Sequence, residues 1–266
     1  MFKKALDFYI KNSIHVSLAV VSLTVMTFFL LEIPTDKNLL FFVFLSSVVG
    51  YNYAKHPDYF LKKIHLKKPK TVFWLSVFCV FGSVFFFFRL NTKAQTGVFI
   101  VGLLTLFYVF PPFNFRSLSG IKIYIVALCW VISTLFLPIF QTEFQINTDV
   151  WLKSVQRFLL IIILILIFEI IDLKEDNPEL KTVPQTIGVK NTKILGVMLL
   201  FLFYGLEFFV SSHKVSQFLP NGIFALIIIL FLFFASEKRS KYYTTFWVES
   251  LPILWLLLSV WLSGKT

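Results

Sequence analysis

The chain has 266 residues, of which 58% are hydrophobic and only 15% are charged. Its mean hydropathy is +0.82. A soluble domain carries roughly a quarter charged residues, so this chain cannot cover a folded surface with polar groups, and a soluble globular protein is excluded. The composition also excludes a disordered chain, a collagen and a disulfide-rich scaffold. We therefore expect a polytopic helical membrane protein.

Lys and Arg outnumber Asp and Glu by 25 to 14, which gives a formal net charge of +11. In a membrane protein such an excess is typical of the loops that stay in the cytoplasm. We therefore expect the lipid bilayer, and no nucleic acid, as the partner of the basic residues. The two cysteines, Cys79 and Cys129, lie inside apolar runs, so neither a disulfide nor a zinc site is expected.

Nine apolar segments follow one another along the chain, separated by polar or Pro- and Gly-containing stretches. They lie at residues 14–33, 38–54, 71–88, 97–113, 121–140, 155–171, 193–210, 219–235 and 246–262. A strict two-residue alternation is absent, which does not support a transmembrane barrel. In lipid, only a helix satisfies every backbone group within one segment. Residues 1–266 are thus predicted to form a single integral membrane domain, an all-α bundle of nine transmembrane helices.

The distribution of Lys and Arg predicts the orientation of the chain. If all nine segments cross the membrane, most of the 25 Lys and Arg residues lie on the side that holds the N-terminus. The positive-inside rule then places the N-terminus in the cytoplasm and the C-terminus outside, in a cell inner or plasma membrane. Two long polar loops, 55–70 and 172–192, would face the cytoplasm, and we expect the chemistry there.

Two carboxylates begin the second of these loops. Asp172 and Asp176 are four residues apart, so they share one face if the preceding helix runs one turn past its apolar segment. A divalent cation would relieve their repulsion, and Mg²⁺ favours such carboxylates while keeping coordination sites for phosphate oxygens. Asn177 and Pro178 are expected to end the helix. A solvated charge cluster would show the same spacing, so the pair alone leaves both readings open.

The residues around this pair resemble a known family. Asp172-x-x-x-Asp176, followed by Lys181-Thr182-Val183-Pro184 and Gly188, is similar to the second aspartate motif of the UbiA superfamily of intramembrane prenyltransferases. Tyr108-Val109-Phe110-Pro111, and the stretch from Lys122 through Trp130 to Pro138, resemble two further helices of that family. The resemblance implies a bundle with a central cavity open to the cytoplasm. It also implies Mg²⁺-dependent transfer of an isoprenyl group from a polyprenyl diphosphate to a hydrophobic acceptor, with aromatic compounds the expected class.

The family's first motif, Asn-Asp-x-x-Asp-x-x-x-Asp, is degraded in this chain. Asn52 matches its leading asparagine, and Asp58 is the only carboxylate of loop 55–70, out of register with the motif. The three aspartate positions of the motif fall on Tyr53, His56 and Phe60. One metal site is therefore incomplete, and the lysines of this loop either replace the missing cation or serve as topology anchors that attract anionic lipid.

The resemblance also implies roles for individual residues. The implied metal ligands are Asp172, Asp176, Asp58 and Asn52. The candidate diphosphate ligands are Lys181, Arg116 and Lys122, although Arg116 and Lys122 would serve equally well as topology anchors. The ring of Tyr108 would stabilise an allylic cation. Glu169, one turn before Asp172, would be a third ligand or would orient the other ligands, unless its side chain snorkels to the interface.

Two other functions remain open. A catalytically impaired protein of the same kind would bind isoprenoid lipid or scaffold a pathway without releasing diphosphate. A transporter would carry ionisable residues near the middle of its spans, and the predicted spans hold almost none, which favours the enzyme. Glu207 and Glu249 lie near the ends of their segments and are expected to be interfacial.

Overall fold

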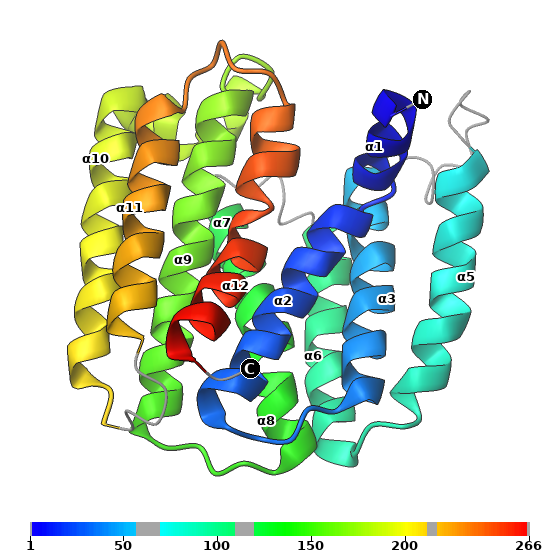
Figure 1. Cartoon of the computed structure of the whole chain (residues 1–266). Coiled ribbons are helices and arrows are strands. Elements are labelled where there is room, and N and C mark those ends of the chain that lie inside the picture. The colour runs from blue at the N-terminus through cyan, green and yellow to red at the C-terminus, as the bar shows by residue number, and fades with distance from the viewer. Residues whose placement is uncertain (1, 57–69, 110–119, 212–216, 265–266) are drawn as a thin grey trace.

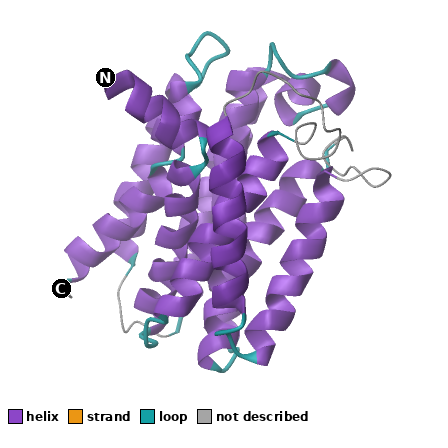
Figure 2. Cartoon of the chain, turned by 90° about the vertical axis from the view of Figure 1, so that its right-hand side faces the viewer, coloured by secondary structure: helices purple, strands orange, loops and turns teal. Residues whose placement is uncertain are grey.

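The computed structural model describes residues 2–56, 70–109, 120–211 and 217–264, and every regular element in these ranges is helical. Figure 1 shows the long helices lying side by side between two ends of the molecule, and Figure 2 shows the same arrangement from the side. Two of the predicted site residues, Asp58 and Arg116, lie outside the described residues.

Each predicted apolar segment overlaps a helical element. These elements are α2 (Ile14–Leu31), α3 (Lys37–Lys55), α5 (Lys70–Phe87), α6 (Thr92–Val109), α7 (Lys122–Val131) with η2 (Ile132–Phe136) and α8 (Leu137–Thr142), α9 (Thr148–Asp172), α10 (Val183–Gly205) with η4 (Leu206–Phe209), α11 (Phe218–Phe234), and η5 (Tyr243–Val248) with α12 (Leu251–Ser263). In the described part of the chain, five helices are long and apolar enough to cross a membrane. The chain is therefore a multi-pass membrane protein, and the number of nine crossings stays a prediction.

Several boundaries differ from the predicted ones. Helix α10 begins at Val183, well before the predicted start at 193, because Gln185 Oε1 accepts a hydrogen bond from the Thr182 backbone N–H at 2.9 Å and Pro184 occupies the first turn. The second polar loop is accordingly shorter than the predicted 172–192. A short amphipathic helix, α1 (Phe2–Lys11), precedes the first apolar segment and was not predicted.

Most of the long helices pack against at least two others in the bundle. Helix α2 packs on α3 and on α12, α7 packs on α9, and α9, α10, α11 and α12 follow one another by contact. Helix α5 lies at one edge of the molecule and packs mainly on α3 (Figure 1). Trp151 and Val155 near the start of helix α9 are exposed, whereas its run from 159 to 164 is apolar throughout and buried, as expected of a helical segment surrounded by others.

The C-terminal ends of α3, α6, α9 and α11 all lie at the end of the molecule that holds α1, which is uppermost in Figure 1. We refer to this as the α1 end. The loops 55–70 and 172–192 were predicted to share one membrane face, and the described residues that flank them lie together at this end. Which side of a membrane the α1 end faces stays a prediction.

Charged side chains lie inside the bundle, contrary to the expectation that the spans are almost free of charge. The guanidinium of Arg157 on α9 is 1% exposed. Its Nη1 atom donates hydrogen bonds to the carbonyl of Leu23 on α2 at 2.8 Å and to the carbonyl of Thr134 in η2 at 3.1 Å. Four acceptor oxygens lie within 3.1 Å of this nitrogen and share its two N–H groups, so the buried cation links three helical elements.

A second buried charge is Glu207 in η4, whose expected position at the membrane interface stays a prediction. Its Oε2 atom lies 2.6 Å from Lys153 Nζ and also accepts hydrogen bonds from Gln156 at 3.0 Å and Asn221 at 3.1 Å. These partners offset the cost of removing the carboxylate from water. The network joins α9, η4 and α11 at the end of the bundle opposite α1.

We expect a matched pair of glycine substitutions on α6 to differ in stability. A Cβ atom at Gly97 would lie 2.7 Å from Leu137 Cδ2 and 3.1 Å from Phe140 Cδ2, whereas one at Gly102 meets nothing within 4 Å. Gly97→Val should therefore lower the free energy of unfolding by about 1–3 kcal/mol more than Gly102→Val, because overpacking costs about that much. Denaturant unfolding in detergent micelles measures the difference. Equal stabilities would contradict the close packing of α6 on α8.

Candidate functional site

A cavity of about 460 Å³ lies near the α1 end, between the last turns of α9 and the first turns of α7, and we call it the polar cavity because charged side chains line part of its wall. The charged side chains that line it, among the described residues, are Lys122, Glu169, Asp172, Asp176 and Glu249. An anionic and a cationic group therefore face the same small volume. Such a mixture suits a ligand that carries its own charge or that brings a counter-ion.

The aspartate pair has the geometry that the sequence predicts. Helix α9 ends at Asp172, and the backbone N–H of Asp176 donates to the carbonyl of Asp172 at 2.9 Å. This bond continues the helical pattern for one more turn, so both carboxylates reach the polar cavity. Asn177 then adopts an extended conformation, with φ −57° and ψ 130°, and ends the turn before Pro178.

Glu169 joins three helices at the floor of this cavity. It is 4% exposed, and its Oε2 atom accepts a hydrogen bond from the backbone N–H of Val183 at the start of α10 at 3.0 Å. Its Oε1 atom lies 3.0 Å from Lys122 Nζ on α7, and the same ammonium lies 3.8 Å from Asp176 Oδ2. Lys122 is thus held between two carboxylates of the α9 region, and Glu169 fixes its position.

A further ion pair, which lines neither cavity, lies within electrostatic reach of Asp172 and Asp176. The ammonium of Lys241 is 61% exposed and donates to the Glu175 carboxylate. That hydrogen bond, together with the attraction of Asp172 and Asp176, raises the pKa of Lys241 above its ordinary value. The loop after α9 is therefore tied to the loop before η5, and Lys241 stays charged at neutral pH.

The carboxylates of the polar cavity fit only one kind of metal site. Among the described residues, no group of three or more His, Cys, Asp or Glu side chains is arranged to hold a metal ion. Glu169 already engages Val183 and Lys122, which leaves Asp172 and Asp176. Mg²⁺ is commonly bound by one or two carboxylates together with water and substrate phosphate oxygens. The residues fit a Mg²⁺ ion that binds together with a phosphate, and they do not fit a metal held by protein groups alone.

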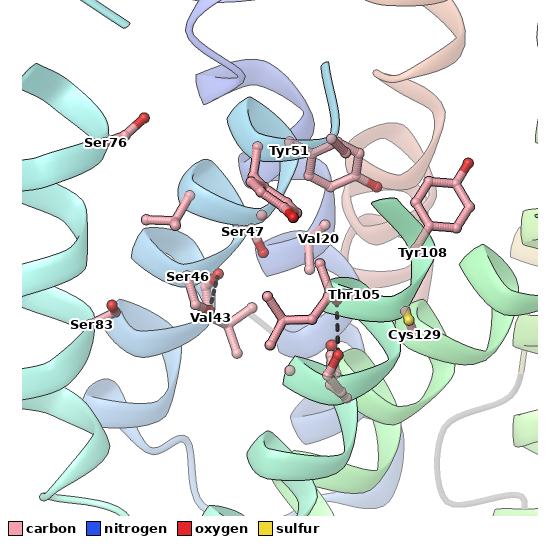
Figure 3. Close-up of a pocket in the computed structure, with 18 of the residues that line it drawn as sticks. Val20, Val43, Ser46, Ser47, Tyr51, Ser76, Ser83, Thr105, Tyr108 and Cys129 are labelled. Atoms are coloured by element: carbon pink, nitrogen blue, oxygen red, sulfur yellow. Dashed lines mark hydrogen bonds between the residues drawn. The ribbon is translucent and has the colours of Figure 1, made fainter. Parts of the chain in front are cut away.

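A larger and mostly apolar cavity, of about 990 Å³, lies between α3, α5, α6 and α7. Figure 3 shows Ser76 and Ser83 of α5 pointing toward α3 across it. The hydroxyl of Ser83 donates to the carbonyl of Val80 at 2.9 Å, and that of Thr105 donates to Val101 at 2.8 Å. Because these hydroxyls bond to their own helices, they add little polarity to the wall. The cavity therefore suits a long apolar ligand.

The two cavities are neighbours and share part of their walls. The residues that line both are Tyr51, Tyr108, Val126, Trp130, Phe168 and Glu249. The indole Nε1 of Trp130 donates to the hydroxyl of Tyr51 at 2.5 Å, which fixes both rings at this junction. The junction thus consists mainly of aromatic rings, with one carboxylate among them.

The structure separates the predicted site residues into two groups. Asn52 is fully buried between α3 and α5, where its amide donates to Ser76 Oγ at 2.9 Å, and it lines neither cavity. Lys181 is exposed after η3 (Pro178–Leu180) and also lines neither cavity. The predicted residues that the structure does bring to the polar cavity are Tyr108, Lys122, Glu169, Asp172 and Asp176.

Two site residues were missed by the sequence reasoning. Glu249 was expected at the membrane interface but lies at the junction of the two cavities. Lys55, which was considered only as part of a basic loop, lines the apolar cavity, with its ammonium 6.0 Å from the centre of the Tyr51 ring. An ionisable residue inside an apolar segment is the signal that would have pointed to Glu249.

No protein-family model and no curated protein sequence matches this chain. Among solved structures, the chain is similar to one reported for digeranylgeranylglyceryl phosphate synthase in membranes. The two share 15% sequence identity with a TM-score of 0.62, over 97% of this chain and 96% of the other. At this identity the likeness establishes the fold, and it confirms the predicted all-helical membrane bundle.

The position of Lys122 leads to a prediction for stability. Lys122→Met should lower the free energy of unfolding by about 2 kcal/mol, because it leaves the buried Glu169 carboxylate without its cation. Lys241→Met removes an exposed ion pair and should cost less than about 1 kcal/mol. Thermal unfolding in detergent compares the two. The double variant Lys122→Met with Glu169→Gln should recover part of the loss, and equal melting of both single variants would contradict the assignment.

Proposed function

We propose that this chain is a UbiA-type membrane prenyltransferase, which transfers an isoprenyl group from a polyprenyl diphosphate to a hydrophobic acceptor in a Mg²⁺-dependent reaction. The observation that carries the proposal is the charged cavity lying directly beside a large apolar cavity inside a membrane bundle. A polyprenyl diphosphate has the same two-part chemistry, an anionic head and an apolar chain. The fold likeness to a digeranylgeranylglyceryl phosphate synthase supports the proposal.

The diphosphate head would bind in the polar cavity. Asp172 and Asp176 would hold Mg²⁺, which when bound neutralises charge on the diphosphate. Lys122, which Glu169 holds in place, donates hydrogen bonds to the phosphate oxygens and favours departure of the diphosphate. Asp58 and Arg116 stay candidate ligands, as the resemblance and the sequence suggest, whereas the buried position of Asn52 does not favour a direct contact with the head.

The prenyl chain would extend into the apolar cavity, which places its reacting carbon at the junction. There the rings of Tyr51, Tyr108 and Trp130 face the carbon as it gains positive charge. Aromatic faces stabilise a cation by about 0.5–2 kcal/mol per contact. The same rings keep water from the reacting carbon, which favours transfer over hydrolysis.

We further propose that the α1 end faces the cytoplasm, with the N-terminus inside and the C-terminus outside. This orientation follows the positive-inside rule. It opens the polar cavity to the compartment that supplies soluble Mg²⁺ and receives the released diphosphate.

The buried charges revive the transporter as a candidate that the sequence had disfavoured. Arg157, Lys153 and Glu207 do lie inside the bundle. All three groups, however, engage neighbouring protein groups and line neither cavity. A structural role for these charges therefore explains them better than a transport path.

The aspartate pair provides the main test of the proposed function. Asp172→Asn and Asp176→Asn should each lower diphosphate release from geranylgeranyl diphosphate by at least about 100-fold, because charge stabilisation of this kind is worth roughly that factor. Glu179→Gln, in the same loop but outside both cavities, is the matched control. Full activity in both aspartate variants would refute the metal assignment. Lipid binding by the wild type without any diphosphate release would instead support a non-enzymatic lipid-binding protein.

The apolar cavity makes a separate prediction about donor length. Gly102 lines this cavity and has open space beside it, so Gly102→Phe should fill the volume that a long chain needs. We expect the preference to shift from geranylgeranyl toward geranyl diphosphate, measured as a ratio of kcat/KM values. Ile100→Phe adds a ring to the exposed face of the same helix and should leave the ratio unchanged. If the ratio is unchanged in Gly102→Phe, the prenyl chain of the donor does not occupy the apolar cavity.

A further inference from the structure

Glu249 occupies a position that the proposed reaction has not yet used. It lines both cavities, and it is the only acid among the described residues that line the apolar one. The other carboxylates of the site, Glu169, Asp172 and Asp176, line only the polar cavity. Glu249 therefore lies closest to the point at which a prenyl chain would meet its acceptor.

The backbone before Glu249 forms a π turn, which affects the direction of this side chain. Glu249 follows directly on η5, a π-helical segment, and its N–H donates to the carbonyl of Thr244 five residues earlier at 3.1 Å. A π turn inserts an extra residue and rotates the following side chains relative to an α-helix, and such turns are frequent at functional sites. His15 on α2 anchors the segment, because its Nε2 atom lies 2.8 Å from the carbonyl of Phe246.

The carboxylate itself has spare hydrogen-bonding capacity. Its Oε2 atom is buried and has no hydrogen-bond partner among the described residues. The three other buried carboxylates among the described residues each have a partner. Asp149 accepts a hydrogen bond from the Ser211 N–H, and Glu169 and Glu207 each lie within 3.0 Å of a lysine ammonium. A buried acceptor atom without a partner is costly, so the oxygen is suited to a donor on a ligand.

Among the described residues, one cation and two phenol hydroxyls act on Glu249 electrostatically. Lys55 from α3 is the cation within electrostatic reach, and the hydroxyls of Tyr51 and Tyr9 also interact with it electrostatically. Lys55 lines the same cavity as Glu249. An ionised carboxylate can only accept hydrogen bonds, so its partner must carry an O–H or N–H group.

We propose that Glu249 binds the hydroxyl group of the acceptor and takes its proton, and that the acceptor is a hydrophobic alcohol or phenol. The proposal rests on the proposed prenyl transfer. In this step the bond between the first prenyl carbon and the diphosphate oxygen breaks, and its electron pair leaves with the diphosphate. A lone pair of the acceptor oxygen forms the new bond to that carbon. The O–H electron pair remains on the oxygen, and the proton moves to the Glu249 carboxylate.

The test compares Glu249→Gln with the wild type in detergent with Mg²⁺ and labelled geranylgeranyl diphosphate. The acceptor probes are a 1-O-alkylglycerol, a 4-alkylphenol and the dimethyl ether of the alkylglycerol, which has no hydroxyl. Prenyl ether formation and diphosphate release are measured separately. Glu249→Asp serves as the conservative variant, and Glu237→Gln, an acid outside both cavities, serves as the matched control.

We expect the wild type to prenylate both hydroxyl probes and not the dimethyl ether. Glu249→Gln should lower transfer to the alkylglycerol by about 100-fold or more, as expected for loss of a general base, while diphosphate release with water falls by less than about 3-fold. The loss should be smaller for the phenol, because a phenol O–H, with a pKa of about 10, ionises more readily. Glu249→Asp should retain intermediate transfer.

Three results would overturn the inference and leave the proposed function standing. The first is that Glu249→Gln transfers the prenyl group as well as the wild type does. The second is that Glu249→Gln loses transfer and diphosphate release equally with all probes. The third is that the wild type releases diphosphate but prenylates neither hydroxyl probe. If the wild type releases no diphosphate at all, the proposed function itself fails, and the inference fails with it.

Discussion

Burying an ion in a medium of low dielectric constant costs several kcal/mol unless the protein supplies partners for it. In this bundle, Arg157 receives its partners from backbone carbonyls and threonine hydroxyls, and Glu207 receives a lysine and two amides. Glu169 is paired with Lys122 and with the first N–H of α10. Most of these contacts join helices that are distant in the sequence. The buried charges therefore add specific links to the apolar packing of the bundle.

The same requirement divides the interior into two compartments. Where carboxylates and an ammonium can satisfy one another beside the loop after α9, the cavity wall carries charged groups. Between α3, α5, α6 and α7, the hydroxyls bond to their own helices, and the cavity is apolar. Aromatic rings separate the two compartments, and a charge that developed at this boundary would face ring faces and one carboxylate, with little water.

The structure shows what the residues at the degraded first aspartate motif do in this chain. Asn52, its remaining match, bonds to Ser76 and packs α3 on α5, so its amide stabilises a helix contact. Lys55, one turn later on α3, faces the cavity instead. Among the described residues, the two cavities together carry two ammonium groups, Lys122 in the polar cavity and Lys55 in the apolar one.

The sequence by itself determined that the chain is a helical membrane protein, because the apolar fraction and the length of its segments leave no other fold. It also determined the local geometry of Asp172 and Asp176, because four residues make one helical turn wherever the helix lies. Only the tertiary structure decided which side chains meet. Glu249 reaches the junction because a π turn changes the rotation of its helix, and Lys122 meets Glu169 because α7 packs on α9. Helix rotation and long-range packing depend on every neighbouring helix at once, so the spacing of residues along one segment cannot specify them.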